Sequence, residues 1–340
     1  MSQHPTAAAE AEKTAPPSAS RYLDLIASKL AATEERLAQL TASDVPIIRD
    51  ASEYIFSGGG KRVRPAMLLL CARLLGRNGE AEITYAAVVE MIHNATLIHD
   101  DIIDRATMRR GRATVSKVWD NSRTVLLGDW LYTRSMQMAL SHDNLEVIRR
   151  LCDSIVRMTE GELMALDRLG SIDLGVHEYF EIIDRKTSRL FAAACSIPAL
   201  IAPTDPKSDE ALYDYGHNLG ICFQLVDDLL DFTGSEADLG KPVHSDLRGG
   251  KLTLPLILAL PRIDGRRRTA VEMILEDGAF ARAQPEEILE IVETEGTLEE
   301  VREMASSYAD RACAALEIFP PSETVDALEF APESVLHRRS

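Results

Sequence analysis

The chain has 340 residues, of which 46% are hydrophobic and 27% charged, a composition typical of a globular protein. Its net charge of −17 argues against a nucleic-acid partner, because an acidic surface repels phosphate backbones. A phosphorylated substrate would therefore need basic residues or bound cations around its site. No run of about 18 apolar residues occurs, so no transmembrane segment is expected. The five cysteines form no CxxC pair, which indicates unpaired, buried thiols and a cytoplasmic location.

Residues 1–20 contain neither an apolar stretch nor an arginine-rich face, so they are predicted to be a disordered tail and not a targeting peptide. Residues 21–340 are predicted to be a single domain in which helical spacing dominates. The long apolar helical stripes fall in 80–104, 144–168, 177–202 and 206–232. Because strand-like alternation is scarce, we predict an all-α fold, with ten to thirteen helices in one large bundle.

Two acidic clusters share the pattern DDxxD, and each ends an apolar helical run. The clusters are Asp100, Asp101 and Asp104, and Asp227, Asp228 and Asp231. Residues i and i+4 of a helix lie on one face, so Asp100 is expected above Asp104, and Asp227 above Asp231. Carboxylate oxygens suit hard cations such as Mg²⁺, which also takes ligands from phosphates. One copy could equally be a solvated helix end, but two copies favour a divalent-cation clamp for a diphosphate.

Basic residues flank both clusters. Those that could contact a phosphate are Lys61, Arg62 and Arg64 after a glycine run, Arg109 and Arg110 after the first cluster, Lys186 between the clusters, and Lys241 and Lys251 after the second. Each alone is more often a surface charge. The glycine run is not a P-loop, because GxxxxGK[ST] does not occur around Lys61. The sequence also lacks a GxSxG elbow, an HExxH motif and a zinc-type spacing of cysteine and histidine.

Taken together, these residues make the sequence resemble the trans-isoprenyl diphosphate synthases, most closely the long-chain bacterial octaprenyl and decaprenyl type. The resemblance runs from about residue 21 to at least residue 320. It is carried by GGKRVRP at 59–65, LIHDDIIDRATMRRGRATV at 97–115, LGD at 127–129, KT at 186–187, FQLVDDLLDF at 223–232, GK at 240–241 and GKLTLP at 250–255.

The resemblance implies a helical bundle around a deep central cavity, a homodimer, and about three Mg²⁺ ions in each active site. It implies that Asp100, Asp104 and Asp227 hold the metal, with Asp101, Asp228 and Asp231 in support. The allylic diphosphate is assigned to Arg109, Lys186, Thr187, Gln224, Lys241 and Lys251, and isopentenyl diphosphate to Lys61, Arg64, His93 and Arg110. Thr187 and Gln224 would face the carbocation through oxygen dipoles, and Phe223 is either a cation–π partner or a core aromatic.

Product length is expected to depend on the residues that precede the first cluster. Ala95 lies five residues before Asp100, or roughly 7.5 Å deeper along a helix. A large aromatic there would block a growing tail, whereas Ala95 and the neighbouring Thr96 are small. This predicts a long product of about C35 to C50, whose usual destination is a quinone side chain such as that of ubiquinone. Tyr132, Met136 and Met138 are equal candidates for the cavity floor.

Three other hypotheses remain open at the level of sequence. A short-chain farnesyl or geranylgeranyl diphosphate synthase would share the motifs. A class I terpene cyclase would share the helical architecture, but such enzymes usually lack the second DDxxD. A non-catalytic subunit of a heteromeric synthase would tend to lose the acidic motifs, and both are intact here.

Overall fold

The computed structural model describes residues 19–201, 204–234, 245–277 and 284–338, and these are almost entirely helical. Besides a two-stranded ribbon of β1 (Met108–Arg109) and β2 (Arg112–Ala113), they contain a 3₁₀ turn η1 (Leu140–His142) and a π-helical turn η2 (Asp184–Ser188). The α-helices are α1 (Ala19–Asp24), α2 (Ala27–Leu40), α3 (Pro46–Ser57), α4 (Val63–Leu74), α5 (Glu80–Ile103), α6 (Val115–Trp119), α7 (Asn121–Ala139), α8 (Leu145–Asp167), α9 (Val176–Ile183), α10 (Arg189–Leu200), α11 (Pro206–Thr233), α13 (Ser245–Arg248), α14 (Leu254–Ala259), α15 (Gly265–Asp277), α16 (Pro285–Thr294), α17 (Thr297–Ala315) and α18 (Glu323–Leu336).

The all-α prediction is confirmed, and each predicted helical stretch corresponds to a helix or a pair of helices. The described residues form seventeen α-helices, more than predicted, because four of them are only four to six residues long. The predicted tail falls mostly outside the described residues, and α1 begins at Ala19. No helix in the described ranges is long and apolar enough to cross a membrane.

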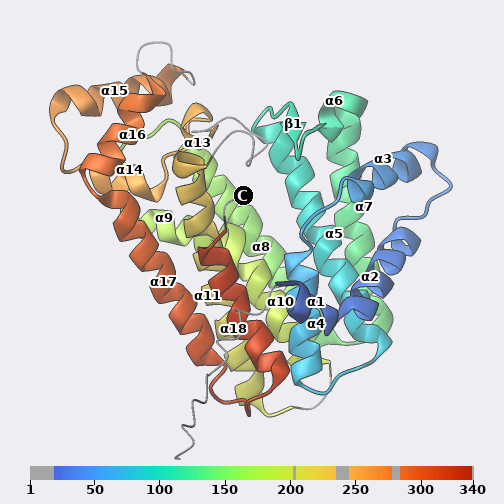
Figure 1. Ribbon diagram of the computed structural model, residues 1–340. Helices are drawn as coiled ribbons and strands as arrows, with labels where there is room; N and C mark the ends of the chain where they lie inside the picture. The colour runs from blue at the N-terminus through green and yellow to red at the C-terminus, as the bar shows by residue number, and fades with distance from the viewer. Residues whose placement is uncertain (1–18, 202–203, 235–244, 278–283, 339–340) are drawn as a thin grey trace, which may run out of the picture.

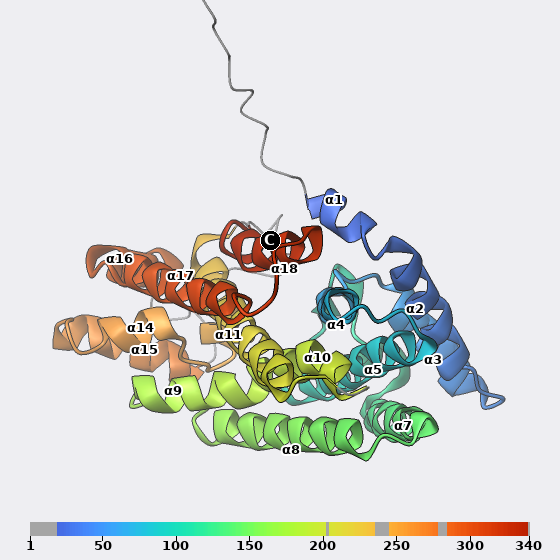
Figure 2. The same ribbon diagram turned by 90° about the horizontal axis from the view of Figure 1, so that it is seen from below.

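The two long helices α5 and α11 organise the bundle (Figure 1). Helix α5 packs against α2, α4 and α7, while α11 packs against α10, α17 and α18. Seen along the bundle, α8 and α9 form one side, and α17 and α18 form the opposite side (Figure 2). Both α5 and α11 end at the same end of the molecule, near the β1–β2 ribbon and α13 (Figure 1). The fold therefore brings the ends of the two acidic helices together.

Helix α5 is buried over most of its length, as its wide apolar stripe predicts. Tyr85, Met91 and Ile92 are completely buried. The helix begins after Gly79, whose backbone N–H donates to the Glu82 carboxylate at 2.9 Å and so satisfies one of the free amides of the first turn. The first acidic cluster is therefore carried on a rigid helix of the core.

Glycine residues allow α11 to lie unusually close to α10 and η2. A Cβ atom at Gly216 would lie 2.5 Å from the carbonyl oxygen of Phe191, and one at Gly220 would lie 2.6 Å from the Cα of Ser188. Because both neighbours are backbone atoms, a larger residue would force the helices apart. This close contact places the second acidic cluster beside Lys186 and Thr187.

All five cysteines are free, but they are not all buried as predicted. Cys71, Cys195 and Cys222 are buried, whereas Cys152 is exposed and Cys313 is half-buried. The expectation was wrong for Cys152 because the outer face of α8, where it lies, is itself apolar and exposed, as described below.

Candidate active site

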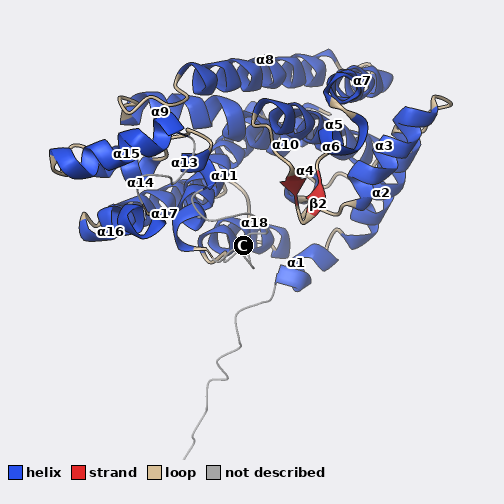
Figure 3. Cartoon of the chain, turned by 90° about the horizontal axis from the view of Figure 1, so that it is seen from above, coloured by secondary structure: helices blue, strands red, loops and turns tan. Residues whose placement is uncertain are grey.

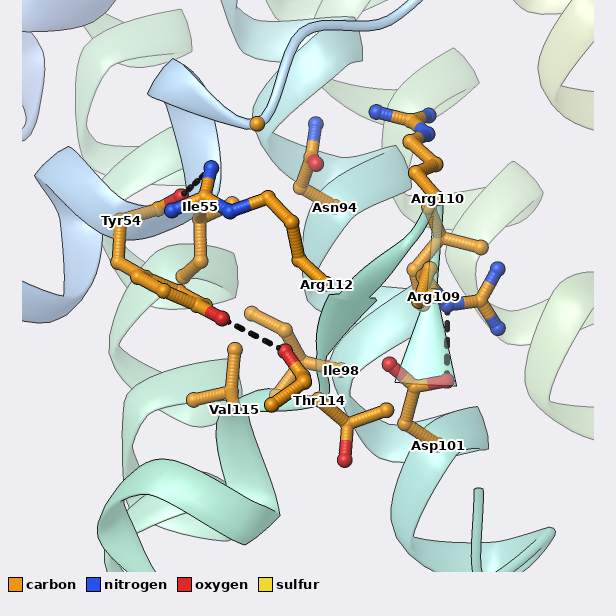
Figure 4. A pocket seen from close by; sticks show the side chains of 13 residues that line it. Tyr54, Ile55, Asn94, Ile98, Asp101, Arg109, Arg110, Arg112, Thr114 and Val115 are labelled. Atoms are coloured by element: carbon orange, nitrogen blue, oxygen red, sulfur yellow. Dashed lines mark hydrogen bonds and ion pairs between the residues drawn. The ribbon is translucent and has the colours of Figure 1, made fainter. Parts of the chain in front are cut away.

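The first acidic cluster divides into two exposed carboxylates and one buried carboxylate. The side chains of Asp100 and Asp104 are 19% and 33% exposed, whereas that of Asp101 is only 5% exposed. Asp101 accepts a hydrogen bond from Arg109 Nε at 2.8 Å, a contact visible in Figure 4. Successive helical residues point in different directions, so Asp101 anchors the β1–β2 ribbon while its neighbours face the solvent-accessible space.

Two lysines from elsewhere in the chain contact the exposed pair. Lys251 Nζ donates to both carboxylate oxygens of Asp104 at 2.7 Å, and Lys186 Nζ lies 3.8 Å from Asp100 Oδ2. Burial raises the pKa of Asp100 to about 6; Lys186 opposes the rise, and Glu162 and Asp104 add to it. The three carboxylates of Asp100, Asp104 and Glu162 therefore outnumber the two lysines that contact them.

The second cluster is divided differently, into one exposed and two buried carboxylates. Asp227 is 42% exposed, and Arg338 lies 3.6 Å from its Oδ1 atom. Asp231 is only 1% exposed and accepts hydrogen bonds from the backbone N–H groups of Ser245 and Asp246 at 3.1 Å. The expected pairing of Asp227 and Asp231 on one open face is therefore not seen, because residues 245–246 cover Asp231.

Asp228 is also buried, at 2% exposure, and both of its oxygens are occupied. Tyr179 Oη donates to Oδ2 at 2.5 Å, and Gln224 Nε2 donates to Oδ1 at 2.9 Å. Burial raises the pKa of Asp228 to about 8, although the hydrogen bonds from Tyr179 and Gln224 oppose the rise. Thr187 Oγ1 in turn donates to Gln224 Oε1 at 2.9 Å. Asp228 thus holds Gln224 by a hydrogen bond, and Gln224 in turn holds Thr187.

Lys186 and Thr187 lie on the π-helical turn η2, a kind of distortion that is frequent at functional sites. Helix α8 packs directly on this turn, because a Cβ atom at Gly161 would lie 2.8 Å from the backbone nitrogen of Lys186. The next residue, Glu162, forms an ion pair with Lys186 Nζ. Burial alone would lower the pKa of Lys186, but Asp100 and Glu162 raise it above its usual value. Glu162 is a site residue that the sequence analysis missed.

A second group of basic residues lies beside this space. The Arg64 guanidinium stacks 4.3 Å from the centre of the Phe191 ring, and its Nε atom is buried without a hydrogen-bond partner in the part of the chain that the structure describes. Burial lowers the pKa of Arg64 to about 10. Burial and the neighbouring Arg64 and Arg110 lower the pKa of His93 well below its usual value, so this histidine is neutral at pH 7. Lys61 is close enough to Asp227 and Arg338 for both to affect its pKa, which burial lowers.

The glycine run and the ribbon hold this basic group in place. Arg110, which has a left-handed backbone with φ of 51°, hydrogen-bonds through Nη1 to the carbonyl oxygen of Gly59. A Cβ atom at Gly60 would lie only 2.8 Å from the same Nη1 atom. Arg62 instead points inward, to Glu34 at 2.6 Å and the buried Glu90 at 2.9 Å. Gly60 itself has a φ of +156°, a backbone conformation that other residues rarely adopt, so glycine is favoured where Arg110 crosses the loop.

A small pocket opens between α3, α5 and the ribbon, behind the predicted diphosphate contacts (Figure 4). Arg112 lies 4.0 Å from the centre of the Tyr54 ring, and Tyr54 Oη donates to the carbonyl oxygen of Ala113 at 2.8 Å. Asn94, Asp101 and the three arginines of the ribbon line the same pocket. These contacts fasten the ribbon to α3, so that Arg109 and Arg110 have fixed positions.

Of the two predicted chain-length residues, Ala95 lies on the face of α5 that packs against α7. Ala95 is completely buried in the apolar cluster that also contains Leu127 and Leu131. Thr96 is half-buried, and its hydroxyl donates to the carbonyl oxygen of His93 at 2.6 Å. Tyr132 is one candidate for the cavity floor. Burial raises the pKa of Tyr132, and the nearby negative charge of Asp100 raises it further. Tyr132 is thus near the acidic cluster and not deep below it.

One predicted contact, Lys241, lies outside the described residues. Arg338, at the end of α18, was given no role from the sequence, yet it contacts Asp227 and lies 5.1 Å from the centre of the Phe223 ring. No local pattern in the sequence marks this arginine, because only the return of α18 across α11 and α4 brings it to the site.

A helical bundle in which two aspartate-rich helix ends and two groups of basic residues share one end defines the all-α isoprenoid synthase class. The chain belongs to the polyprenyl synthetase family, whose model matches residues 45–292. It is 39% identical over 305 residues to the octaprenyl diphosphate synthase of Escherichia coli K12, covering 90% of this chain and 94% of the relative.

Solved structures give the same assignment. A polyprenyl synthase from Caulobacter crescentus, crystallised with calcium and isoprenyl diphosphate, superimposes with a TM-score of 0.91 at 36% identity, covering 95% of this chain and 98% of that one. A decaprenyl diphosphate synthase from Rhodobacter capsulatus superimposes with a TM-score of 0.89 at 34% identity, covering 95% and 100%. Members of this family are prenyltransferases.

Proposed function

We propose that this chain condenses an allylic diphosphate with successive isopentenyl diphosphates and releases pyrophosphate at each step. The product would be an all-trans polyprenyl diphosphate of about C35 to C50, as the octaprenyl and decaprenyl relatives indicate. The observation that carries the proposal is that Lys186 and Lys251, from two distant segments, meet the exposed carboxylates of Asp100 and Asp104. Positive and negative groups that suit a metal-bound diphosphate are thereby brought into one site.

We propose Mg²⁺ as the cofactor, with about three ions per site as the family resemblance implies. The exposed carboxylates of Asp100, Asp104 and Asp227 are the donors with the right chemistry. Within the described ranges, no three acidic, histidine or cysteine side chains meet closely enough to hold an ion alone. This fits Mg²⁺, which usually binds one or two carboxylates and takes other ligands from phosphate and water. Bound Mg²⁺ would neutralise charge that develops on the leaving pyrophosphate.

The allylic diphosphate would bind next to the lysines that now contact the aspartates. Lys186 and Lys251 can exchange a carboxylate partner for a phosphate oxygen, and Arg109 is held nearby by Asp101. The remaining family position, Lys241, is proposed for the same subsite. Thr187, held by Gln224, would direct its oxygen towards the positive charge that forms when the allylic C–O bond breaks.

Isopentenyl diphosphate would bind the second basic group, formed by Lys61, Arg64, His93 and Arg110. Arg64 and Arg110 bring two guanidinium groups to this subsite, and the Nε atom of Arg64 has no hydrogen-bond partner among the described residues. Neutral His93 can donate one ring N–H to a phosphate oxygen without adding to the repulsion between the arginines. The alkene would attack the allylic cation, and pyrophosphate would accept the proton that is lost.

We also propose a homodimer formed through α7 and α8. These helices form an outer edge of the bundle (Figure 3). Leu145, Val156 and Leu163 are exposed along one face of α8, and Leu126 of α7 is 68% exposed. Such an apolar strip is typical of an interface. Light scattering should give the mass of a dimer, and Leu126→Lys combined with Leu163→Glu should yield monomers. Ile318→Glu, at an equally exposed site outside both helices, should not; a monomeric wild type would contradict the proposal.

The activity is tested with purified protein, MgCl₂, farnesyl or geranylgeranyl diphosphate, and isopentenyl diphosphate, with products resolved by mass. Long polyprenyl diphosphates are expected, and chelation of the metal should stop their formation. Products of four or fewer isoprene units would indicate a short-chain synthase. Hydrocarbon from farnesyl diphosphate alone would indicate a terpene cyclase, and inactivity until a second protein is added would indicate a heteromeric subunit.

Three further properties are part of the same proposal. The free cysteines support a reducing, cytoplasmic location. A quinone side chain, such as that of ubiquinone, is the proposed destination of the product. Residues 21–340 are proposed to act as one domain, since the described helices from α1 to α18 share one continuous bundle.

A further inference from the structure

Tyr179 is a buried tyrosine outside the motifs quoted in the sequence analysis, yet it is linked to the candidate active site by three hydrogen bonds. Its hydroxyl contacts Asp228 at 2.5 Å, Asp228 contacts Gln224 at 2.9 Å, and Gln224 contacts Thr187 at 2.9 Å. The four residues come from α9, α11 and η2. Tyr179 is 3% exposed, and its ring packs edge-on against Phe180 at 5.5 Å, so the hydroxyl has a fixed position.

The chemistry of these groups sets the direction of each hydrogen bond. Asp228 Oδ1 accepts a hydrogen bond whether or not the other oxygen, Oδ2, carries a proton, so Gln224 turns its amide Nε2 towards it. Its Oε1 atom then faces Thr187, and the Thr187 hydroxyl must donate its proton to that oxygen. The lone pairs of Thr187 Oγ1 are left for the active site, where a positive charge is expected to form.

We call the hydrogen-bonded series Tyr179–Asp228–Gln224–Thr187 the relay. Tyr179 holds its far end. Without its hydroxyl, Asp228 Oδ2 would lose the hydrogen bond from Tyr179 inside a buried site. A buried carboxyl group with a missing partner is free to rotate, and rotation releases Gln224 to reverse its amide. Reversal would turn the Thr187 proton, and not its lone pairs, towards the reacting carbon.

We propose that Tyr179 is a positioning residue for the condensation, acting through Asp228 and Gln224 to fix the orientation of the Thr187 hydroxyl. The inference rests on the proposed function. It also gives Asp228 a role that does not involve direct contact with a metal ion: both of its oxygens hold the relay.

The test is Tyr179→Phe, which removes one oxygen and keeps the ring packed against Phe180. The kcat of condensation should fall about tenfold, while KM for both diphosphates stays within about twofold, because the relay faces the reacting carbon and not the phosphates. Tyr215→Phe is the matched control: Tyr215 is fully buried and donates to the carbonyl oxygen of Leu328 at 2.8 Å, on the side of α11 that faces α18. The Tyr215→Phe variant should lose about as much thermal stability as Tyr179→Phe, but its kcat should stay within about twofold of wild type.

A double-mutant comparison separates the relay from a general effect on packing. In a Thr187→Val background, Tyr179→Phe should lower kcat by less than about twofold, because the hydroxyl that it orients is gone. Equal losses in both backgrounds, or a kcat of Tyr179→Phe that matches Tyr215→Phe, would overturn the inference. If Tyr179→Phe does not fold, Gln224→Met breaks the relay at the next link, and an undiminished kcat there overturns it. A wild-type protein that elongates no primer would overturn the proposed function as well.

Discussion

Replacing Glu162 with glutamine should weaken the allylic subsite by releasing Lys186. The Glu162 side chain is 13% exposed and forms an ion pair with Lys186, which lies between it and Asp100. Glutamine has the same shape, so the close packing of α8 on η2 at Gly161 should remain. The substitution therefore removes a charge and little else.

The magnitude follows from the geometry. The 3.8 Å between Lys186 Nζ and Asp100 Oδ2 corresponds to about 4 kcal/mol of attraction at an effective dielectric constant of about 20. Glu162 is nearer still, but desolvation offsets much of such an attraction, and Lys186 is 29% exposed. We expect the loss of the Glu162–Lys186 ion pair to cost about 2 kcal/mol, which lies between the energies typical of exposed and of buried ion pairs. This cost corresponds to a fall of roughly 30-fold in kcat/KM for the allylic primer.

The pH dependence should move as well, with a sign that the structure determines. Burial is the largest cause of the raised pKa of Asp100, and the charge of Glu162 adds to it. Removing that charge lowers the pKa of Asp100 from about 6, so its carboxylate persists to lower pH. The acid limb of the kcat/KM profile at saturating MgCl₂ should shift to lower pH while the plateau falls.

Glu160→Gln is the matched control for this experiment. Glu160 lies on the same helix and also contacts η2, but its partner is Arg185, at 2.7 Å. Its kcat/KM should stay within about threefold of wild type. Equal losses of kcat/KM in the two variants would refute the reasoning. They would show that the contact between α8 and η2 determines activity and that the charge on Lys186 does not. An acid limb that stays in place in Glu162→Gln would refute the charge argument.

Three other outcomes follow from the structure. Ala95→Phe should shorten the product on mass analysis while condensation continues, because a ring would enter the buried contact of α5 with α7; unchanged product lengths would remove Ala95 from chain-length control. Arg338→Ala should raise KM for isopentenyl diphosphate about fivefold in steady-state assays, since a partly exposed pair with Asp227 is worth about 1 kcal/mol; an unchanged KM would show that Arg338 is not a substrate contact. Burial raises the pKa of Asp228 to about 8, above the unfolded value of 3.8, so its stabilising contribution is present below the unfolded pKa and is lost as pH rises through about 8. The Tm of the metal-free protein should therefore fall between about pH 4 and pH 8 in calorimetry, less so in Asp228→Asn, and equal slopes would assign the change to other groups.

The sequence was sufficient to predict the helical fold and to group Lys186 and Lys251 with the first acidic motif, which they contact in the structure. Helical periodicity is a property of neighbouring residues, so the stripe in 80–104 could be recognised without tertiary information and corresponds to α5. The short helices were missed because four to six residues carry too little periodicity to detect.

Glu162 and Arg338 could not be found from the sequence for a different reason. A glutamate on an amphipathic helix is usually solvated, and only the contact of Gly161 with η2 shows that Glu162 faces inward. Arg338 follows the last helix and carries no motif around it. Both depend on contacts between segments that are far apart in the chain, which local patterns do not encode.

The two acidic motifs show how one short pattern can supply both a ligand and its support. A helix turns about 100° per residue, so adjacent aspartates cannot face the same space. Asp100 and Asp227 are exposed to the site, while Asp101 and Asp228 point into the protein, to Arg109 and to the relay that ends at Thr187. The second aspartate of each pair therefore orients a neighbouring residue, Arg109 in the first motif and Gln224 in the second.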